Sequence, residues 1–325
     1  NLDIVEEIVK SAAFVSGFKK PIKTDYVIAD LRASSDIDLD TLKNSSLIYE
    51  RQKTRNFNSS TKLNIRPFIA SREEFFKAAL LIENNNEYIF KDNLIFSSNL
   101  KYSLADNFDD LRYPPVNTFP AQVRSDIKNY LRKFDDGIKI GRAQLDYYLT
   151  VKDNNHLMFT GGILEEMFSG YGFEYLYFNS KKDYAYGFEI FSVAKRDYDM
   201  TFGTLDYKNT VGSINFYYRN HIIVPFDVKI SHGEYLAGDK GSTFELSRTY
   251  LNGAKFGVFA SFTDVTTEQF GEGTFDKGIF FTIPVFKNLV DYTWRPLTKD
   301  PGAKLNRKHT LHDLLVKFRP YHRKD

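Results

Sequence analysis

The sequence has no cysteine and a single tryptophan among its 325 residues. The lack of cysteine excludes disulfide bonds, thiolate metal sites, cysteine nucleophiles and a lipid-bearing cysteine within this chain. No apolar run approaches the length of about 18 residues that a membrane-spanning helix needs, and no charged-then-apolar signal peptide opens the chain at Asn1. We therefore expect either a soluble protein or one that crosses a membrane as a β-barrel.

The chain also lacks a strong excess of charge of either sign. Lysine and arginine number 44 against 42 aspartates and glutamates, which gives a net charge of +2. A nucleic-acid partner is not expected, because such proteins usually carry a basic excess or a basic stripe. What the chain has in abundance is 30 phenylalanines and 21 tyrosines, and this composition favours β-strands.

The first 60 residues differ from the rest. Leu2, Val5 and Val9 follow helical spacing in a segment that closes at Gly17, which predicts an amphipathic helix. Residues 21–60 are polar and irregular. We expect residues 1–60 to form a small N-terminal α/β segment or linker and residues 61–325 to form a separate β domain.

From residue 61 the dominant pattern is the alternation of apolar and polar residues in segments bounded by turn-forming residues. In one such segment Phe226, Val228 and Ile230 alternate with three polar residues, as expected where one face of a strand meets an apolar phase and the other meets water. The segments predicted as strands are 61–70, 74–83, 93–104, 142–151, 184–194, 211–220, 224–231 and 255–263.

These segments predict an all-β fold of roughly 12 to 14 antiparallel strands of about 9 to 14 residues. Membrane-spanning strands need about 9 to 11 residues, whereas strands of soluble proteins centre near 5 or 6. The length favours an antiparallel transmembrane β-barrel, with residues 1–60 in the periplasm. A soluble β-sandwich or jelly roll with an aromatic inner face stays open.

Two kinds of site are disfavoured by their spacing. Gly233 and Gly238 have the separation of a phosphate-binding loop, but Asp239 stands where that loop needs a lysine. His309 and His312 lie close together without further zinc ligands. Residues 117–134 fit either an amphipathic helix or a strand.

Acidic residues suggest one catalytic alternative. Glu165, Glu166 and Glu174, together with Asp197 and Asp199, could supply the two carboxyl groups of a glycosidase, which must lie about 5 to 10 Å apart. Inward-facing acids of a water-filled barrel explain the same residues, and spacing in the sequence does not decide between the two.

The segment 268–286 combines three glycines with acidic residues and then becomes apolar. Glycine tolerates the bend of a tight turn, so we interpret this segment as a turn that leads into a strand. Its charges would gather with others around one barrel mouth and contact a polysaccharide or a partner protein. The predicted contact residues are Tyr235, Asp239, Arg248, Glu268, Glu272, Asp276 and Lys277, with Glu166 and Glu174. The residues predicted to face the barrel interior are Arg66, Asp146, Glu189, Arg219, Asp227 and Lys229.

Four stretches resemble a known family. Residues 119–132, 161–178, 233–284 and 294–305, the last reading WRPLTKDPGAKL, are similar in sequence, order and spacing to the YjbH/GfcD family. Its members are outer-membrane β-barrel proteins, often lipoproteins, encoded with exopolysaccharide or capsule export genes. They are usually about twice this length, so the resemblance implies that this chain is the second half of such a protein.

The resemblance implies a place in the bacterial outer membrane and a role in secretion or assembly of a surface polysaccharide, as a conduit or as a scaffold. The implied partners are the polysaccharide, outer-membrane lipid, the N-terminal half or a second barrel, a polysaccharide-export lipoprotein and periplasmic capsule proteins. No enzymatic activity, cofactor or metal is expected. A glycan-modifying enzyme and a soluble carbohydrate-binding β-sandwich are the alternatives.

Overall fold

The computed structural model describes most of the chain from Phe57 onwards. The described residues are 57–69, 75–91, 93–112, 121–152, 154–179, 182–220, 225–250, 254–270, 275–285, 290–294 and 300–316. The predicted helix near the N-terminus and the predicted segment 1–60, apart from residues 57–60, lie outside them.

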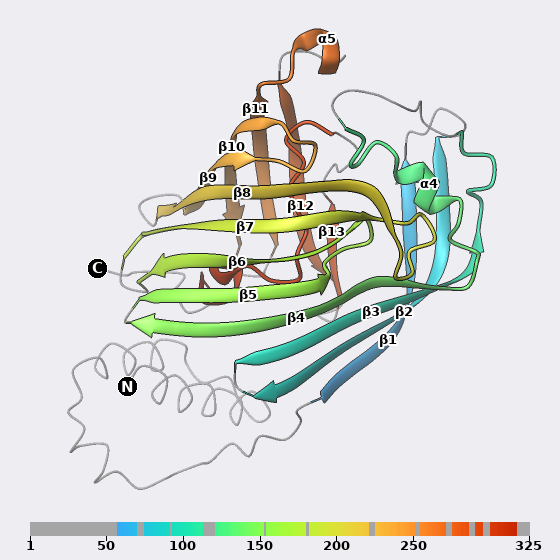
Figure 1. Cartoon of the computed structure of the whole chain (residues 1–325), viewed down its shortest axis with the longest axis horizontal. Coiled ribbons are helices and arrows are strands. Elements are labelled where there is room, and N and C mark those ends of the chain that lie inside the picture. Colours follow the sequence, from blue (N-terminus) through green and yellow to red (C-terminus); the bar gives the residue numbers. More distant parts are fainter. Residues whose placement is uncertain are drawn as a thin grey trace, which may run out of the picture. The chain divides into compact units, whose positions relative to one another are not determined.

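Within these residues, thirteen strands form one antiparallel sheet in which each strand pairs with its neighbours in sequence (Figure 1). The strands are β1 Phe57–Ile69, β2 Phe76–Lys91, β3 Leu94–Asp106, β4 Ile138–Lys152, β5 Asn155–Ile163, β6 Phe168–Phe178, β7 Tyr184–Arg196, β8 Thr204–Asn220, β9 Phe226–Glu234, β10 Lys240–Thr249, β11 Lys255–Thr263, β12 Asp276–Val285 and β13 Val290–Trp294. All eight segments predicted as strands lie largely within this sheet, so the predicted antiparallel all-β fold is confirmed.

β5, β6, β10 and β13 are not among these eight segments, and in β5 glycines interrupt the alternation. Gly161 and Gly162 lie just before the last residue of this strand, Ile163, and Gly162 lies opposite Gly170 of β6. The backbones approach closely here, since a Cβ atom on Gly170 would lie 2.2 Å from the carbonyl oxygen of Ser192 on β7. Close backbone approach is a known reason for glycine inside a strand.

Three short helices occur among the described residues: α4 Ile127–Leu131, α5 Thr267–Phe270 and α6 Leu311–Leu315. α4 lies in the segment 117–134, for which the sequence left helix and strand open. No helix in the described part of the chain has the length and apolar character needed to cross a membrane.

The sheet ends at β1 on one side and at β13 on the other. The described residues contain no pairing between these two strands, so the closure expected of a barrel is not seen in them. The sheet is nevertheless strongly curved, because residues of β1–β4 and of β8–β12 line one common cavity. We call the face toward this cavity the inner face and the opposite one the outer face.

Burial on the two faces is the reverse of that in a soluble protein. On β8, Ile214 and Phe216 are 69% and 42% exposed on the outer face, whereas Asn215 and Arg219 on the inner face are 5% and 9% exposed. The same reversal occurs on neighbouring strands. Exposed apolar residues of these strands are Leu145, Tyr147, Phe159, Tyr186, Phe188, Ile190, Phe244 and Leu246. Buried polar residues are Gln144, Asp146, Thr160, Glu174, Ser231, Thr243 and Ser247.

Strand register aligns the outer apolar residues into rows. Tyr147 of β4 lies opposite Phe159 of β5, which lies opposite Phe173 of β6, and Phe173 lies opposite Ile190 of β7. Cross-strand neighbours on one face touch, so the row forms a continuous apolar band across the sheet.

Two apolar cores fill the inner side at opposite ends of the strands. Phe168, the first residue of β6, belongs to the first core, and Phe178, the last residue of β6, belongs to the second. Along a strand that separation is about 33 Å. The connection between β3 and β4 supplies much of the first core, through Phe108, Leu111, Val123, Tyr130, Leu131 and Phe134.

Candidate functional site

Residues 300–316, which we call the C-terminal segment, run along the inner side of the sheet from the first core to the second (red in Figure 1). Ala303 belongs to the first core and Leu311 to the second. The polar region between the two cores is the candidate site. Its geometry is set by how this segment is held.

At the first core the C-terminal segment is held by hydrogen bonds that the Asp300 side chain accepts and by one that the Gly302 backbone N–H donates. Oδ1 of Asp300 accepts hydrogen bonds from three consecutive N–H groups, of Val123, Arg124 and Ser125, at 2.9, 2.7 and 2.9 Å. Two residues further, the Gly302 N–H donates to Asp239 Oδ2 at 2.8 Å. These bonds tie the segment both to the β3–β4 connection and to the β9–β10 turn.

Asp239 is an acid in an unfavourable environment for its charge. Its side chain lies in the buried turn between β9 and β10. Burial raises the pKa of its carboxyl to about 6, although the hydrogen bond from the Gly302 N–H opposes this shift. Its protonation state therefore affects one anchor of the C-terminal segment.

In the middle of the segment Arg307 forms a buried ion-pair network. Its guanidinium contacts Glu174 of β6 at 3.0 Å and also Glu189 of β7. The Leu311 N–H donates to both carboxylate oxygens of Glu174 at 3.1 Å. Because the two glutamates are opposite each other in the sheet register, their repulsion is relieved by the arginine.

At the second core the segment ends in a capped helix. Thr310 caps α6 by accepting a hydrogen bond from the Asp313 N–H at 3.1 Å. The His312 ring stacks on Tyr217 of β8, with centroids 3.8 Å apart and planes 7° from parallel. The segment thus has tertiary anchors at both ends and at its centre.

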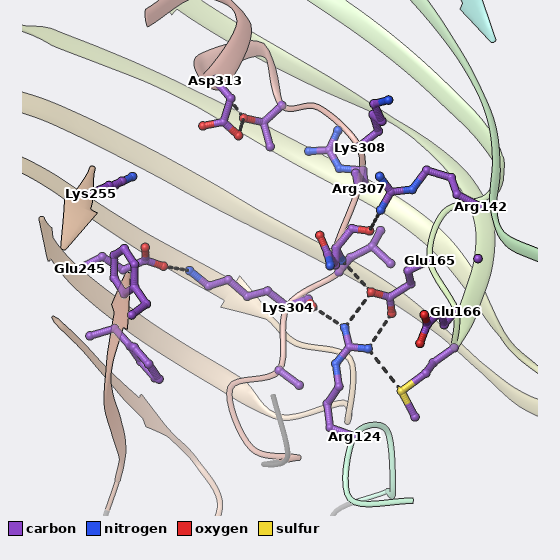
Figure 2. A pocket seen from close by; sticks show the side chains of 18 of the residues that line it. Arg124, Arg142, Glu165, Glu166, Glu245, Lys255, Lys304, Arg307, Lys308 and Asp313 are labelled. Atoms are coloured by element: carbon purple, nitrogen blue, oxygen red, sulfur yellow. Dashed lines mark hydrogen bonds and ion pairs between the residues drawn. The ribbon is translucent and has the colours of Figure 1, made fainter. Parts of the chain in front are cut away.

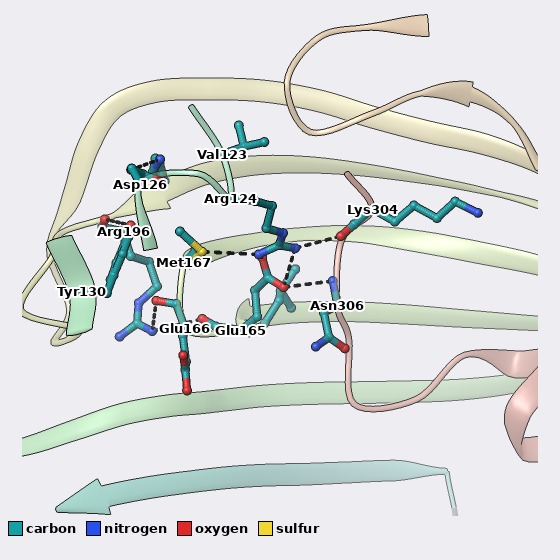
Figure 3. Close-up of polar contacts among 12 residues, drawn as sticks. Val123, Arg124, Asp126, Tyr130, Glu165, Glu166, Met167, Arg196, Lys304 and Asn306 are labelled. Carbon is teal, nitrogen blue, oxygen red and sulfur yellow. Dashed lines mark hydrogen bonds and ion pairs between the residues drawn. The ribbon is translucent and has the colours of Figure 1, made fainter. Parts of the chain in front are cut away.

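A second ion pair joins the β5–β6 turn to the β3–β4 connection and to the C-terminal segment (Figure 3). Arg124 contacts Oε1 and Oε2 of Glu165 at 2.8 and 3.0 Å and donates to the Lys304 carbonyl at 2.8 Å. Oε2 of Glu165 also accepts from the Asn306 N–H at 3.1 Å. Glu165 therefore positions the C-terminal segment by accepting hydrogen bonds.

Arg196 at the end of β7 fixes the backbone of the same turn (Figure 3). Its Nη1 donates to the carbonyls of Glu165 and Glu166 at 3.0 and 2.9 Å. The Tyr130 hydroxyl donates to the Arg196 carbonyl at 2.7 Å, which links this turn to α4.

Glu166 is held by two cations from the opposite part of the sheet. Its Oε1 lies 2.6 Å from Arg66 of β1 and 2.5 Å from Lys101 of β3. Burial alone would raise the pKa of the Glu166 carboxyl, but the charges of Arg66 and Lys101 outweigh burial and hold the pKa well below its ordinary value. Glu166 is accordingly an ionised acid, unsuited to donate a proton at neutral pH.

Between these networks remains a cavity of about 1390 Å³ (Figure 2). It is lined by inner-face residues of strands on both sides of the sheet and by residues 301–308 of the C-terminal segment. The charged side chains labelled in Figure 2 come from the strands, the β3–β4 connection, the β5–β6 turn and the segment itself. A cavity of this size with many charged side chains in its wall suits a hydrated chain that carries polar groups.

The structure brings together several of the predicted contact residues. Tyr235 and Asp239 lie in the β9–β10 turn, and Glu268, Asp276 and Lys277 lie at the same end of β11 and β12, because Asp276 pairs with Ser261 and Gly241 with Thr263. Tyr235 and Asp239 are buried, whereas Glu268 and Lys277 are exposed.

Other predicted contact residues lie elsewhere. Arg248 is at the opposite end of β10, opposite Phe256, so it does not share the predicted mouth. Glu166 and Glu174 are on the inner side in the networks with Arg66, Lys101 and Arg307. Glu272 lies outside the described residues.

The residues predicted to face the interior do so. Arg66, Arg219, Asp227 and Lys229 line the cavity. Asp146 is buried and accepts hydrogen bonds from Gln144 and Thr160, and Glu189 contacts Arg307. Strand alternation alone was sufficient to place them.

The sequence reasoning missed the C-terminal segment and its Arg307, Asp300 and Lys304. These residues follow the last strand and carry no alternation, so nothing local marked them as inner residues. The signal that could have indicated them is the basic stretch KLNRKH, residues 304–309, after the last strand. The described residues contain no group of three or more acids and histidines placed to hold a metal ion.

Comparison with known proteins agrees with the sequence resemblance. A family model described as "Exopolysaccharide biosynthesis protein YbjH", of the YjbH family, matches residues 4–317. The "Uncharacterized lipoprotein YjbH" of Escherichia coli (strain K12) is 30% identical over 259 residues, which cover 76% of this chain and 36% of that protein. The match therefore spans about a third of the relative's length. Both matches confirm the predicted family.

Proposed function

Since this chain belongs to the YjbH exopolysaccharide biosynthesis family, we propose that it is a β-barrel component of exopolysaccharide or capsule secretion in a bacterial outer membrane. The observation that carries this proposal is the reversed burial of the sheet, with a band of apolar residues outside and ionic networks inside. In water such a band would leave a large apolar surface uncovered, whereas lipid would cover it.

The outer face of β8 supports a membrane boundary. The exposed residues of its first half are Thr204, Asp206, Lys208 and Thr210, and those of its second half are Ile214, Phe216 and Tyr218. A strand of 17 residues is longer than the roughly 9 to 11 that a bilayer requires. We therefore place the hydrocarbon region over the second half of β8 and its neighbours.

Within this barrel the C-terminal segment acts as a plug that narrows the interior. We assign to the barrel a scaffold role, or that of a conduit which is closed at rest, in which the surface polysaccharide contacts the remaining cavity. Strands from the rest of the longer protein, or a second barrel, would complete the pairing of β1 and β13. A polysaccharide-export lipoprotein and periplasmic capsule proteins are the expected partners.

The test is membrane fractionation combined with gel mobility. We expect the protein to enter the outer-membrane fraction, to resist carbonate extraction and to migrate faster in unheated than in boiled samples, as folded barrels do. A protein that is monodisperse in buffer without detergent would contradict the proposal and favour the soluble carbohydrate-binding alternative.

The enzyme alternative is less well supported by the acids that suggested it. Glu165, Glu166 and Glu174 each contact at least one arginine within 3.0 Å. A glycosidase needs one carboxylic acid whose pKa is raised so that it can protonate the leaving group, and Glu166 has the opposite shift. We expect no change in polymer length on incubation with the purified protein.

A further inference from the structure

The charge of the cavity wall differs from that of the whole chain. Eleven lysines and arginines line the cavity against seven aspartates and glutamates, whereas the chain as a whole has nearly equal numbers. A wall with an excess of one sign in a recessed space concentrates ligands of the other sign.

Most of the acids in the wall are already neutralised. Glu165 pairs with Arg124, Glu166 with Arg66 and Lys101, Asp227 with Arg219, and Glu245 with Lys304. These pairs contribute little net charge to the space between them.

Arg142 and Lys255 are two of the four cations of the wall, with Lys62 and Lys229, for which the described residues contain no ion pair. Arg142 donates only to neutral groups, the carbonyls of Leu164 at 2.8 Å and Asn306 at 3.1 Å. Lys255 has an aromatic contact alone, with its Nζ 5.7 Å from the Phe280 ring centroid. Within the described residues no carboxylate forms an ion pair with either side chain.

These two cations border the same space from different sides. Figure 2 shows Arg142 and Lys255 on either side of the C-terminal segment, which carries Lys304 and Arg307. A ligand with regularly spaced negative groups could contact both sides at once.

From these contacts we infer that the cavity binds an anionic stretch of polysaccharide, in which carboxylate groups of the sugars are held by Arg142 and Lys255. Carboxylates match the planar guanidinium of arginine, and hydroxyls of the sugar rings can bond the polar inner face. This inference rests on the proposed function and specifies its ligand as an acidic glycan.

The experiment compares two oligosaccharides of matched length, an oligogalacturonate and an uncharged maltooligosaccharide, with the protein purified in detergent micelles. Binding is measured by isothermal titration calorimetry at low and high salt. We expect the acidic oligosaccharide to bind at least about tenfold more tightly than the neutral one at low salt. That preference should fall as sodium chloride screens the charges.

Arg142→Gln/Lys255→Gln should reduce acidic binding by at least about tenfold. Because Arg142 also holds two backbone carbonyls, Lys255→Gln is measured alone and should cause part of the loss without affecting the fold. The matched control is Lys240→Gln, whose exposed side chain pairs with Glu234 at 3.5 Å and lies outside the cavity lining. It should bind like the unaltered protein.

Equal binding of the two oligosaccharides, or full binding by the double variant, would overturn the inference. Binding of phosphate-bearing lipid micelles with no binding of oligogalacturonate would also overturn it, because the ligand would then be a lipid headgroup. Outer-membrane fractionation and heat-modifiable mobility do not depend on the glycan. A negative result in the binding experiment therefore leaves the proposed β-barrel unaffected, and a failure of the proposed β-barrel would be detected by fractionation and gel mobility.

Discussion

At the residue scale, the inner side of the sheet is organised by buried charge pairs, and Arg307 with Glu174 is among the most enclosed of those in the described residues. The side chains of Arg307 and Glu174 are 2% and 4% exposed. A buried pair is weak evidence for net stability, but removing one partner leaves charges that cannot be solvated. Its value here is that it fixes where the C-terminal segment lies.

We expect Arg307→Ala to destabilise the protein by about 3 to 5 kcal/mol, because two facing glutamates would keep their charge without a cation. The measurement is urea unfolding in detergent micelles. Lys240→Ala is the control, since its pair with Glu234 is solvent-exposed and its loss should cost at most about 1 kcal/mol. Combining Arg307→Ala with Glu174→Gln should restore part of the loss. Equal effects of Arg307→Ala and Lys240→Ala would show that the network does not hold the segment.

A pH effect is expected at Asp239. Its carboxyl has a pKa of about 6 in the folded protein against an ordinary 3.8, so between these values the folded state binds more protons than the unfolded state. Stability from this group is therefore lost as the pH rises through this window, by at most about 3 kcal/mol. Asp239→Asn should remove this part of the pH dependence. Thermal midpoints of both proteins from pH 4 to pH 7 test this, and parallel curves would contradict it.

At the scale of single elements, the outer face of β8 changes from polar to apolar along its length. Lys208 and Thr210 precede Ile214, Phe216 and Tyr218 on the same face. The alternation of buried and exposed residues shows which side chains face outward. The polarity of these outward side chains indicates which part of the strand contacts lipid.

Ile214→Lys should therefore be damaging and Thr210→Lys tolerated, although both place a lysine on the outer face of β8. We expect Ile214→Lys to cost about 2 to 4 kcal/mol if it lies near the middle of the bilayer. Unfolding in lipid vesicles and the yield of heat-modifiable protein measure this. If the two variants lost the same stability, lipid would not cover the second half of β8.

The strands themselves were the most predictable elements. Alternation placed inner residues such as Asp227 and Lys229 correctly. Side chains of a strand alternate between the two faces, so the face of one residue determines the face of all the others. β5 was missed since its glycines carry no side chain to signal a face, and α4 stayed ambiguous because its five residues are too few to establish a helical period.

At the scale of the whole molecule, the interior is divided between two apolar cores and a polar middle that the C-terminal segment crosses. If this segment is a plug, removing residues 300–325 should increase the conductance of single channels in planar lipid bilayers several-fold. Truncation after Val316, which keeps all anchors from Asp300 to α6, is the matched control and should conduct like the intact protein. Unchanged conductance in both would favour a scaffold that never opens.

Local alternation was enough to predict the antiparallel all-β architecture and the face on which the residues of most strands lie. Four stretches of sequence were enough to predict the family. Tertiary structure alone decided which charges meet. Arg307 contacts Glu174 and Glu189, and Arg124 contacts Glu165. The two residues of each pair are at least 41 positions apart in the sequence. Such pairs form only when the curved sheet encloses a segment that has no pattern of its own, so no local signal could have revealed them.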